Sequence, residues 1–123
     1  MSKYIYIIDD DPGILDATSK ALELHGYSVN TYMYGVTAIN QLFTNSDESM
    51  PDLILMDVLL QNEDGVECCR TIKENSNTAS IPVVLFSAQD FPEAVIVNCG
   101  ASAFIRKPFS LTELMGTIER CTQ

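Results

Sequence analysis

Short hydrophobic runs alternate with amphipathic segments along the whole chain. The runs at residues 4–8, 53–56 and 83–86 are almost uninterrupted, which is typical of strands buried on both faces. Residues 27–32 and 103–105 form shorter or weaker runs and predict two further strands. We therefore expect an α/β fold in a single domain over residues 1–123.

The segments between these strands have helical spacing. The first helix is predicted to start with Asp11 as its N-cap and Pro12 at its first position, and to end before Gly26. A capping box at residues 110–113 begins the last helix. Three more helices are predicted around residues 39–43, 66–72 and 93–99, with a loop at 45–51 and a turn at 61–65. Strands that alternate with helices favour parallel pairing, with helices on both faces of the sheet.

Composition narrows the class of protein. The 123 residues carry a net charge of −10, which argues against direct nucleic-acid binding because phosphate contacts need clustered Lys and Arg. A basic partner, a cation site and plain solubility are all compatible with this charge. Neither a hydrophobic segment of about 20 residues nor a signal peptide is expected, so the predicted location is cytoplasmic, without membrane contact. The four cysteines lack metal-type spacing and are interpreted as incidental thiols.

Three consecutive aspartates follow the first hydrophobic run. Asp11 is used as the helix cap, which leaves Asp9 and Asp10 at the carboxyl end of a strand. Carboxylates this close repel each other unless a cation joins them. Taken alone, the run is also compatible with a solvated helix start.

The other strands also end in chemically distinctive groups. Asp57 follows the second long hydrophobic run, Ser87 the third, and Lys107 the last strand. The carboxyl ends of parallel strands meet at one edge of a sheet, where such folds bind their ligands. We therefore expect these groups to share one site with Asp9 and Asp10.

This set of groups suits metal-assisted phosphoryl transfer to a carboxylate. Asp57 is the candidate nucleophile, and Asp10 with Asp57 is expected to hold Mg²⁺, with Asp9 assisting. Lys107 can neutralise a phosphoryl oxygen, and Ser87 can donate a hydrogen bond to another. Catalysis of this kind consists of positioning and charge stabilisation.

The chain resembles the receiver domain of two-component response regulators, including those of chemotaxis. The likeness extends from residue 5 to about residue 118. The matching pieces are Ile7-Ile8-Asp9-Asp10-Asp11-Pro12, Pro51-Asp52-Leu53-Ile54-Leu55-Met56-Asp57, Asp64-Gly65, Ser87-Ala88, Gly100-Ala101 and Lys107-Pro108-Phe109. Each piece is weak alone, but their combination and order are specific. The resemblance implies a flavodoxin-like (βα)5 fold, doubly wound, with strand order 2-1-3-4-5.

The resemblance also implies a role for each group. Asp57 corresponds to the phosphoacceptor for a histidine kinase's phosphohistidine. Asp9 and Asp10 correspond to the acidic pair around Mg²⁺, with the backbone carbonyl of Leu59 as a further metal ligand. Lys107 occupies the position of the family's lysine.

Two positions correspond to the family's switch. Ser87 is at the position of the switch hydroxyl and Phe104 at that of the switch aromatic, although Phe104 taken without its spacing to Lys107 fits a core residue better than a switch. In the family, phosphorylation shifts both groups and remodels the surface of the fourth helix, fifth strand and fifth helix. That surface is the predicted site of partner binding and of possible dimerisation. Gln61 replaces the usual proline after the phosphoacceptor.

We therefore expect a signalling switch rather than a metabolic enzyme. Its partners would be a sensor histidine kinase or phosphotransfer protein, and a downstream protein or an effector domain in a longer regulator. Two alternatives are a degenerate receiver used only for protein contact and a flavodoxin-like cofactor-binding module. The second alternative is disfavoured because Asp9, Asp10 and Asp11 occupy the loop that would cradle a phosphate.

Overall fold

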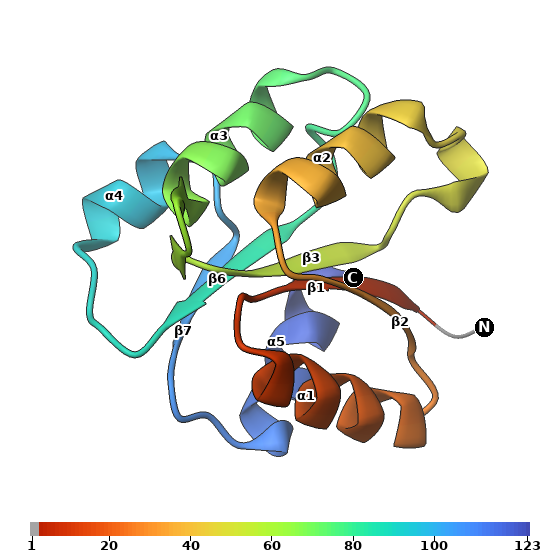
Figure 1. Ribbon diagram of the computed structural model, residues 1–123, viewed down its shortest axis with the longest axis vertical. Coiled ribbons are helices and arrows are strands. Elements are labelled where there is room, and N and C mark those ends of the chain that lie inside the picture. Colours follow the sequence, from red (N-terminus) through yellow and green to blue (C-terminus); the bar gives the residue numbers. More distant parts are fainter. Residues whose placement is uncertain (1–2) are drawn as a thin grey trace.

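A five-stranded parallel sheet lies between two layers of helices (Figure 1). The computed structural model describes residues 3–123. The long strands and their helices alternate as β1 (Tyr4–Ile8), α1 (Pro12–Leu24), β2 (Ser28–Tyr32), α2 (Gly35–Thr44), β3 (Leu53–Asp57), α3 (Gly65–Glu74), β6 (Val83–Ser87), α4 (Glu93–Asn98), β7 (Ala103–Arg106) and α5 (Leu111–Cys121). The shorter elements are the 3-10 helix η1 (Asp47–Ser49) and the two-residue strands β4 (Leu59–Leu60) and β5 (Glu63–Asp64).

The strand order is β2-β1-β3-β6-β7, and every neighbouring pair is parallel. Because β4 and β5 form a separate hairpin, this order is the predicted 2-1-3-4-5 for the five long strands. The flavodoxin-like (βα)5 fold expected from the sequence is confirmed. Strands β1 and β3 occupy the middle of the sheet, so the groups that follow them lie side by side.

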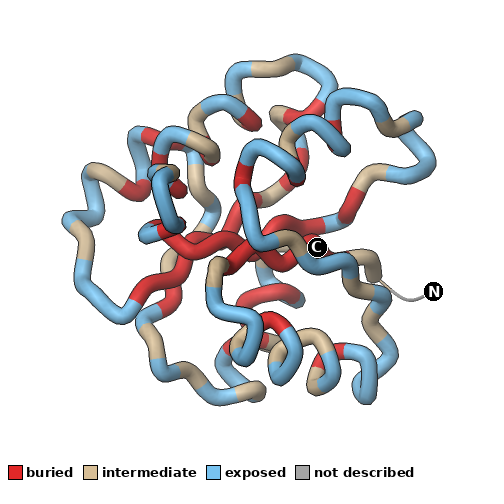
Figure 2. Tube along the Cα trace, viewed as in Figure 1, coloured by how far each residue is buried: buried red, intermediate tan, exposed pale blue. Residues whose placement is uncertain are grey.

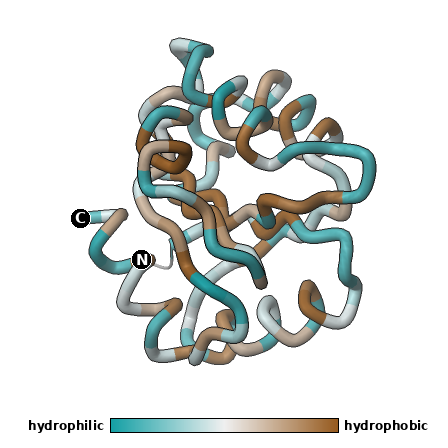
Figure 3. Tube along the Cα trace, turned by 90° about the vertical axis from the view of Figure 1, so that its left-hand side faces the viewer, coloured by the Kyte–Doolittle hydropathy of each residue, from teal (hydrophilic) through white to brown (hydrophobic). Residues whose placement is uncertain are grey.

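The two faces of the sheet bury separate hydrophobic clusters. Ile5 and Ile7 of β1 point toward α1 and α5, whereas Tyr6 and Ile8 point toward α2, α3 and α4. Strands β3 and β6 are buried along their whole length, as Figure 2 shows for the centre of the molecule. Figure 3 shows hydrophobic segments through the middle of the molecule and hydrophilic segments mostly around its outside. This explains the uninterrupted apolar runs in the sequence.

Several helix ends follow the predicted chemistry. The Asp11 carboxylate accepts hydrogen bonds from the backbone N–H groups of Gly13 and Ile14, at 2.9 and 3.3 Å. The Ser110 hydroxyl accepts from the Glu113 N–H at 3.0 Å. Gly26 ends α1 with φ of 91°, a conformation that glycine adopts without steric cost. Among residues 3–123, no helix combines the length and hydrophobicity required to cross a membrane.

Two segments differ in detail from the sequence expectation. The predicted turn at residues 61–65 is part of the β4–β5 hairpin, with Asn62 in the left-handed region at φ of 61°. Helix α4 ends at Asn98, and its N-cap, Pro92, supplies no side-chain hydrogen bond. Ile96 is the buried residue of this short helix, while Val97 is 62% exposed.

Candidate functional site

The predicted site residues follow neighbouring strands at the carboxyl edge of the sheet. Asp9 follows β1, Asp57 ends β3, Ser87 ends β6, and Lys107 follows β7. Backbone hydrogen bonds extend the pairing to this edge, since the Lys107 N–H donates to the Ser87 carbonyl at 2.8 Å. Residues nearly 100 positions apart in the chain are thereby brought together.

Lys107 joins the two buried aspartates. Its Nζ donates to Asp57 Oδ2 at 2.8 Å and to Asp9 Oδ2 at 3.0 Å. The side chains of Asp9 and Asp57 are 0% and 8% exposed, and that of Lys107 is 17% exposed. The ammonium group also lies 4.6 Å from the centre of the Phe86 ring, whose face attracts a cation. Two carboxylates therefore share one cation in a site that is largely closed to water.

Backbone N–H groups orient the other carboxylate oxygens. The Asp11 N–H donates to Asp9 Oδ1 and the Leu59 N–H donates to Asp57 Oδ1, both at 2.9 Å. Each aspartate thus has one oxygen fixed by the backbone and one by Lys107. This double attachment leaves little freedom for either side chain.

Burial and neighbouring charges shift the pKa values of Asp9 and Lys107 in opposite directions. Burial raises the pKa of Asp9, and the Asp11 N–H and Lys107 only partly offset this effect. Burial lowers the pKa of Lys107, but its hydrogen bonds and charge interactions with Asp57 and Asp9 outweigh it, so that the pKa is raised. Lys107 is accordingly a permanent cation at neutral pH.

The acidic groups exceed what one lysine can neutralise. Asp9, Asp10 and Asp57 each offer a carboxylate oxygen, and these oxygens lie within 4.8 Å of one another. Oxygen donors gathered at this spacing are the ligands that Mg²⁺ and Ca²⁺ prefer. The residues present therefore fit a divalent cation, in agreement with the acidic cluster expected from the sequence.

Ser87 and Phe104, the two residues predicted to form the switch, lie in different surroundings. Ser87 is 1% exposed at the edge of the sheet, and its Oγ accepts a hydrogen bond from the Gln89 N–H at 3.1 Å. Phe104 lies within β7 and is half-buried against the cluster that contains α4. Its ring centre is 6.1 Å from that of Phe91, in the segment between β6 and α4. Ser87 thus borders the carboxylates, whereas Phe104 borders α4.

Sequence reasoning missed two connections around this site. Arg106 donates to the Ala88 carbonyl and to Asp90 Oδ1, both at 2.7 Å, and ties β7 to the segment after Ser87. Glu63, in the hairpin after Asp57, accepts two backbone N–H groups of α2. Neither residue has a periodic pattern or motif that would single it out. The Lys107–Pro108 peptide bond is cis.

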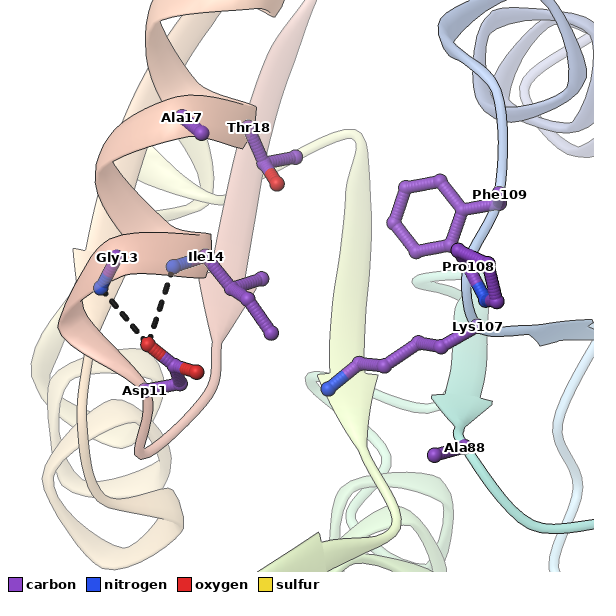
Figure 4. Close-up of a pocket in the computed structure, with 9 residues that line it drawn as sticks. All are labelled: Asp11, Gly13, Ile14, Ala17, Thr18, Ala88, Lys107, Pro108 and Phe109. Atoms are coloured by element: carbon purple, nitrogen blue, oxygen red, sulfur yellow. Dashed lines mark hydrogen bonds between the residues drawn. The ribbon is translucent and has the colours of Figure 1, made fainter.

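A groove of about 490 Å³ borders the site on the side of α1. Figure 4 shows Ile14 of α1 and Phe109 facing the space between α1 and the segment after β7, with Lys107 and Ala88 below Phe109 in this view. The groove therefore joins an apolar surface to the charged site.

The fold and site together define a flavodoxin-like α/β protein with a lysine-bridged acidic centre at the carboxyl edge of its sheet. The sequence model of the response regulator receiver domain matches residues 5–119. The chain belongs to this family and is a receiver domain of two-component signal transduction.

Individual relatives agree with this assignment. The nisin biosynthesis regulatory protein NisR of Lactococcus lactis subsp. lactis is 35% identical over 94% of this chain and 48% of its own length. The signal receiver domain of a signal transduction histidine kinase from Syntrophus aciditrophicus is 31% identical, with a TM-score of 0.86 over 98% of this chain and 90% of its own. The receiver domain of sensor histidine kinase PA1611 from Pseudomonas aeruginosa PAO1 has the same fold, with 23% identity and a TM-score of 0.85 over 99% and 98% of the two chains. The chain spans about half the length of NisR.

Proposed function

We propose that this chain is a phosphoacceptor switch whose acceptor is Asp57. The observation that carries the proposal is the bridge from Lys107 to Asp9 and Asp57 within the acidic group. A buried carboxylate with both oxygens oriented, next to a fixed cation, is arranged to react with an anionic phosphoryl group.

In the proposed reaction, an oxygen of Asp57 attacks the phosphorus of a phosphohistidine. The P–N bond breaks, the imidazole leaves with the bonding electrons and takes up a proton, and an acyl phosphate forms on Asp57. Lys107 then neutralises a phosphoryl oxygen instead of the unmodified carboxylate, and the Ser87 hydroxyl donates to another.

A divalent cation completes the charge balance. Asp9, Asp10, Asp57 and the backbone carbonyl of Leu59 would hold Mg²⁺, which when bound supplies the positive charge that lets carboxylate and phosphoryl oxygens approach. The PA1611 receiver domain, with the same fold, has a magnesium ion coordinated in its active site cleft. Asp11 keeps its role as the cap of α1.

The response would pass through Ser87 and Phe104. Movement of the Ser87 hydroxyl toward a phosphoryl group would release its contact with Gln89 and favour a second position of the segment that leads to α4. Phe104, which packs against Phe91, would follow. The surface of α4, β7 and α5 would then change its affinity for a downstream protein, for an effector domain or for a second copy of this chain.

The phosphodonor would be a sensor histidine kinase or a phosphotransfer protein in the cytoplasm. The groove beside Lys107 supports docking of such a donor because apolar Ile14 and Phe109 border the charged site directly (Figure 4). Residues 1–123 would act as one receiver unit, and the charge of −10 disfavours direct contact with nucleic acid.

Acetyl phosphate tests the proposal without a cognate kinase. With Mg²⁺, the intact mass should increase by one phosphoryl group in the wild type and in Asp16→Asn, which alters an exposed carboxylate paired with Lys20. Asp57→Ala should show no increase. Incorporation that persists in Asp57→Ala would reject the assigned acceptor. Absence of incorporation in the wild type would favour a receiver used only as a protein-interaction module.

A further inference from the structure

The β4–β5 hairpin supports the phosphoacceptor from one side. It begins two residues after Asp57, and its first residue, Leu59, donates the N–H that fixes Asp57 Oδ1. Any displacement of this hairpin would therefore move the hydrogen bond that orients the acceptor. The question is what holds a hairpin of two-residue strands in place, since isolated hairpins are marginally stable.

One attachment comes from the hairpin's own base. The Gly65 N–H donates to the Val58 carbonyl at 2.8 Å, and a Cβ on Gly65 would lie 2.2 Å from the Asp57 carbonyl oxygen. Glycine is therefore required where α3 begins. This hydrogen bond joins the two ends of the hairpin to each other and leaves the position of the hairpin relative to the neighbouring helices to other contacts.

The second attachment is Glu63. Its Oε1 accepts a hydrogen bond from the Gly35 N–H at 2.7 Å, and its Oε2 accepts one from the Val36 N–H at 2.8 Å. Both carboxylate oxygens are therefore bonded to the first turn of α2. The N-cap of α2, Tyr34, makes no side-chain hydrogen bond to this turn. Glu63 thus supplies from another element the acceptors that a helix start requires.

The start of α2 is also closely packed around Gly35. Gly35 is buried, and a Cβ there would lie 2.7 Å from Cys68 Sγ and 3.4 Å from Glu63 Oε2. The start of α2 is thereby held between α3 and the hairpin. Directly opposite Glu63 in the hairpin is Leu60, which is 6% exposed. Glu63 therefore connects a fixed helix to the strand whose Leu59 N–H reaches Asp57.

We propose that Glu63 is a positioning residue for phosphorylation: its bond to the first turn of α2 keeps the β4–β5 hairpin where Leu59 orients Asp57. This inference rests on the proposed phosphoacceptor function. It adds a residue that touches neither the phosphodonor nor the acceptor and acts through the backbone. The chain of contacts runs from α2 through Glu63 and the hairpin to Asp57.

Glu63→Ala is the direct test, using the full chain, acetyl phosphate and Mg²⁺. At saturating Mg²⁺ the initial rate of phosphorylation should fall about 10-fold, because small displacements of reacting groups are costly. Glu63→Gln retains an acceptor for one N–H and should recover part of the rate. Glu67→Ala removes another carboxylate, paired with Arg70 on α3, and should leave the rate unchanged. Equal rates for wild type and Glu63→Ala would overturn the proposal.

A second measurement does not depend on phosphorylation. In Glu63→Ala, the Leu59 amide should exchange its hydrogen faster, while amides of β3 keep their protection, as followed by NMR. A general loss of stability would accelerate both sets of amides. Unchanged exchange at Leu59 would reject the positioning role even if the wild type accepted no phosphoryl group. Failure of phosphorylation in the wild type alone would reject only the proposed function.

Discussion

At the carboxyl edge of the sheet, the region around Asp9 and Asp57 is fixed by many more contacts than the region of α4. On one side, β1 and β3 are buried along almost their whole length, and Asp9 and Asp57 are each fixed by a backbone N–H and by Lys107. On the other side, α4 is six residues long and has no side-chain cap at Pro92. The same sheet thus carries a firmly held region around Asp9 and Asp57 and a lightly held α4 region.

This difference separates two requirements of a switch. Groups that react must keep their positions to within a fraction of an ångström, whereas a surface that responds must have a second arrangement close in free energy. Elements with few buried contacts are the ones that rearrange at low cost. The contrast supports the proposed division of labour between Asp57 and the α4 surface.

The largest predicted contrast is between two isoleucines of the same hydrophobic cluster. Ile8→Ala in β1 should lower the free energy of unfolding by about 4 kcal/mol, and Ile96→Ala in α4 by about 2 kcal/mol, because a lightly held helix can relax around the cavity. Urea denaturation measures both. Equal losses would show that α4 is as firmly integrated as the central strand.

Removing the shared cation should have the next largest effect. Lys107→Ala leaves two buried carboxylates without their partner, and we expect a loss of about 3 kcal/mol in the absence of divalent cations. Lys20→Ala, which breaks an exposed ion pair with Asp16, should cost less than about 0.5 kcal/mol. Similar results for the two variants would mean that the bridge from Lys107 does not stabilise the region around Asp9 and Asp57.

Asp9→Asn should raise the free energy of unfolding at neutral pH in the absence of Mg²⁺. This gain should be smaller than the loss caused by Lys107→Ala. Burial raises the pKa of Asp9 in the folded state above its usual 3.8, so its ionisation opposes folding. This penalty is absent well below pH 3.8 and grows as pH rises through the folded-state pKa. In thermal unfolding, the melting temperature of the wild type should therefore decline as the pH rises through this range. The melting temperature of Asp9→Asn should decline less.

The same variant should respond less to Mg²⁺. At ten times the Kd, Mg²⁺ should stabilise the wild type by about 1.4 kcal/mol. Asp9→Asn should gain less at the same concentration, because one carboxylate of the acidic group is gone. An unchanged Mg²⁺ response would place the ion away from Asp9.

Arg106→Ala should have the smallest effect on global stability, below about 0.5 kcal/mol, since its bond to Asp90 is exposed. Its local effect should be larger, because Arg106 also holds the Ala88 carbonyl. Amide exchange in residues 88–91 should accelerate, whereas Arg70→Ala on α3 should leave it unchanged. Unaltered exchange in both variants would show that Arg106 does not restrain this segment.

The sequence predicted the parts of the molecule that follow from periodicity. Buried parallel strands produce uninterrupted apolar runs, and their ends mark one edge, so the convergence of Asp9, Asp57 and Lys107 could be predicted. The helix start at Asp11 was equally accessible because capping needs only local chemistry.

Contacts between distant elements were not accessible in this way. The β4–β5 hairpin is too short for a periodic pattern, although the left-handed Asn62 is a residue type enriched in such turns. The bonds from Glu63 to α2 depend on how two loops meet, which a single sequence does not encode locally. The shared bridge from Lys107 was likewise beyond prediction, because spacing placed the three groups at one edge without giving their contacts.

The bond between Lys107 and Asp9 closes a loop across 98 positions of a 123-residue chain. No contiguous fragment that lacks either end of this interval contains the full site. Contacts of such long range form only after the intervening strands have paired. Acceptance of a phosphoryl group would therefore serve as an assay of complete folding, since a half-folded chain offers aspartates but no assembled centre. A signalling pathway built on this centre would therefore ignore nascent or misfolded copies.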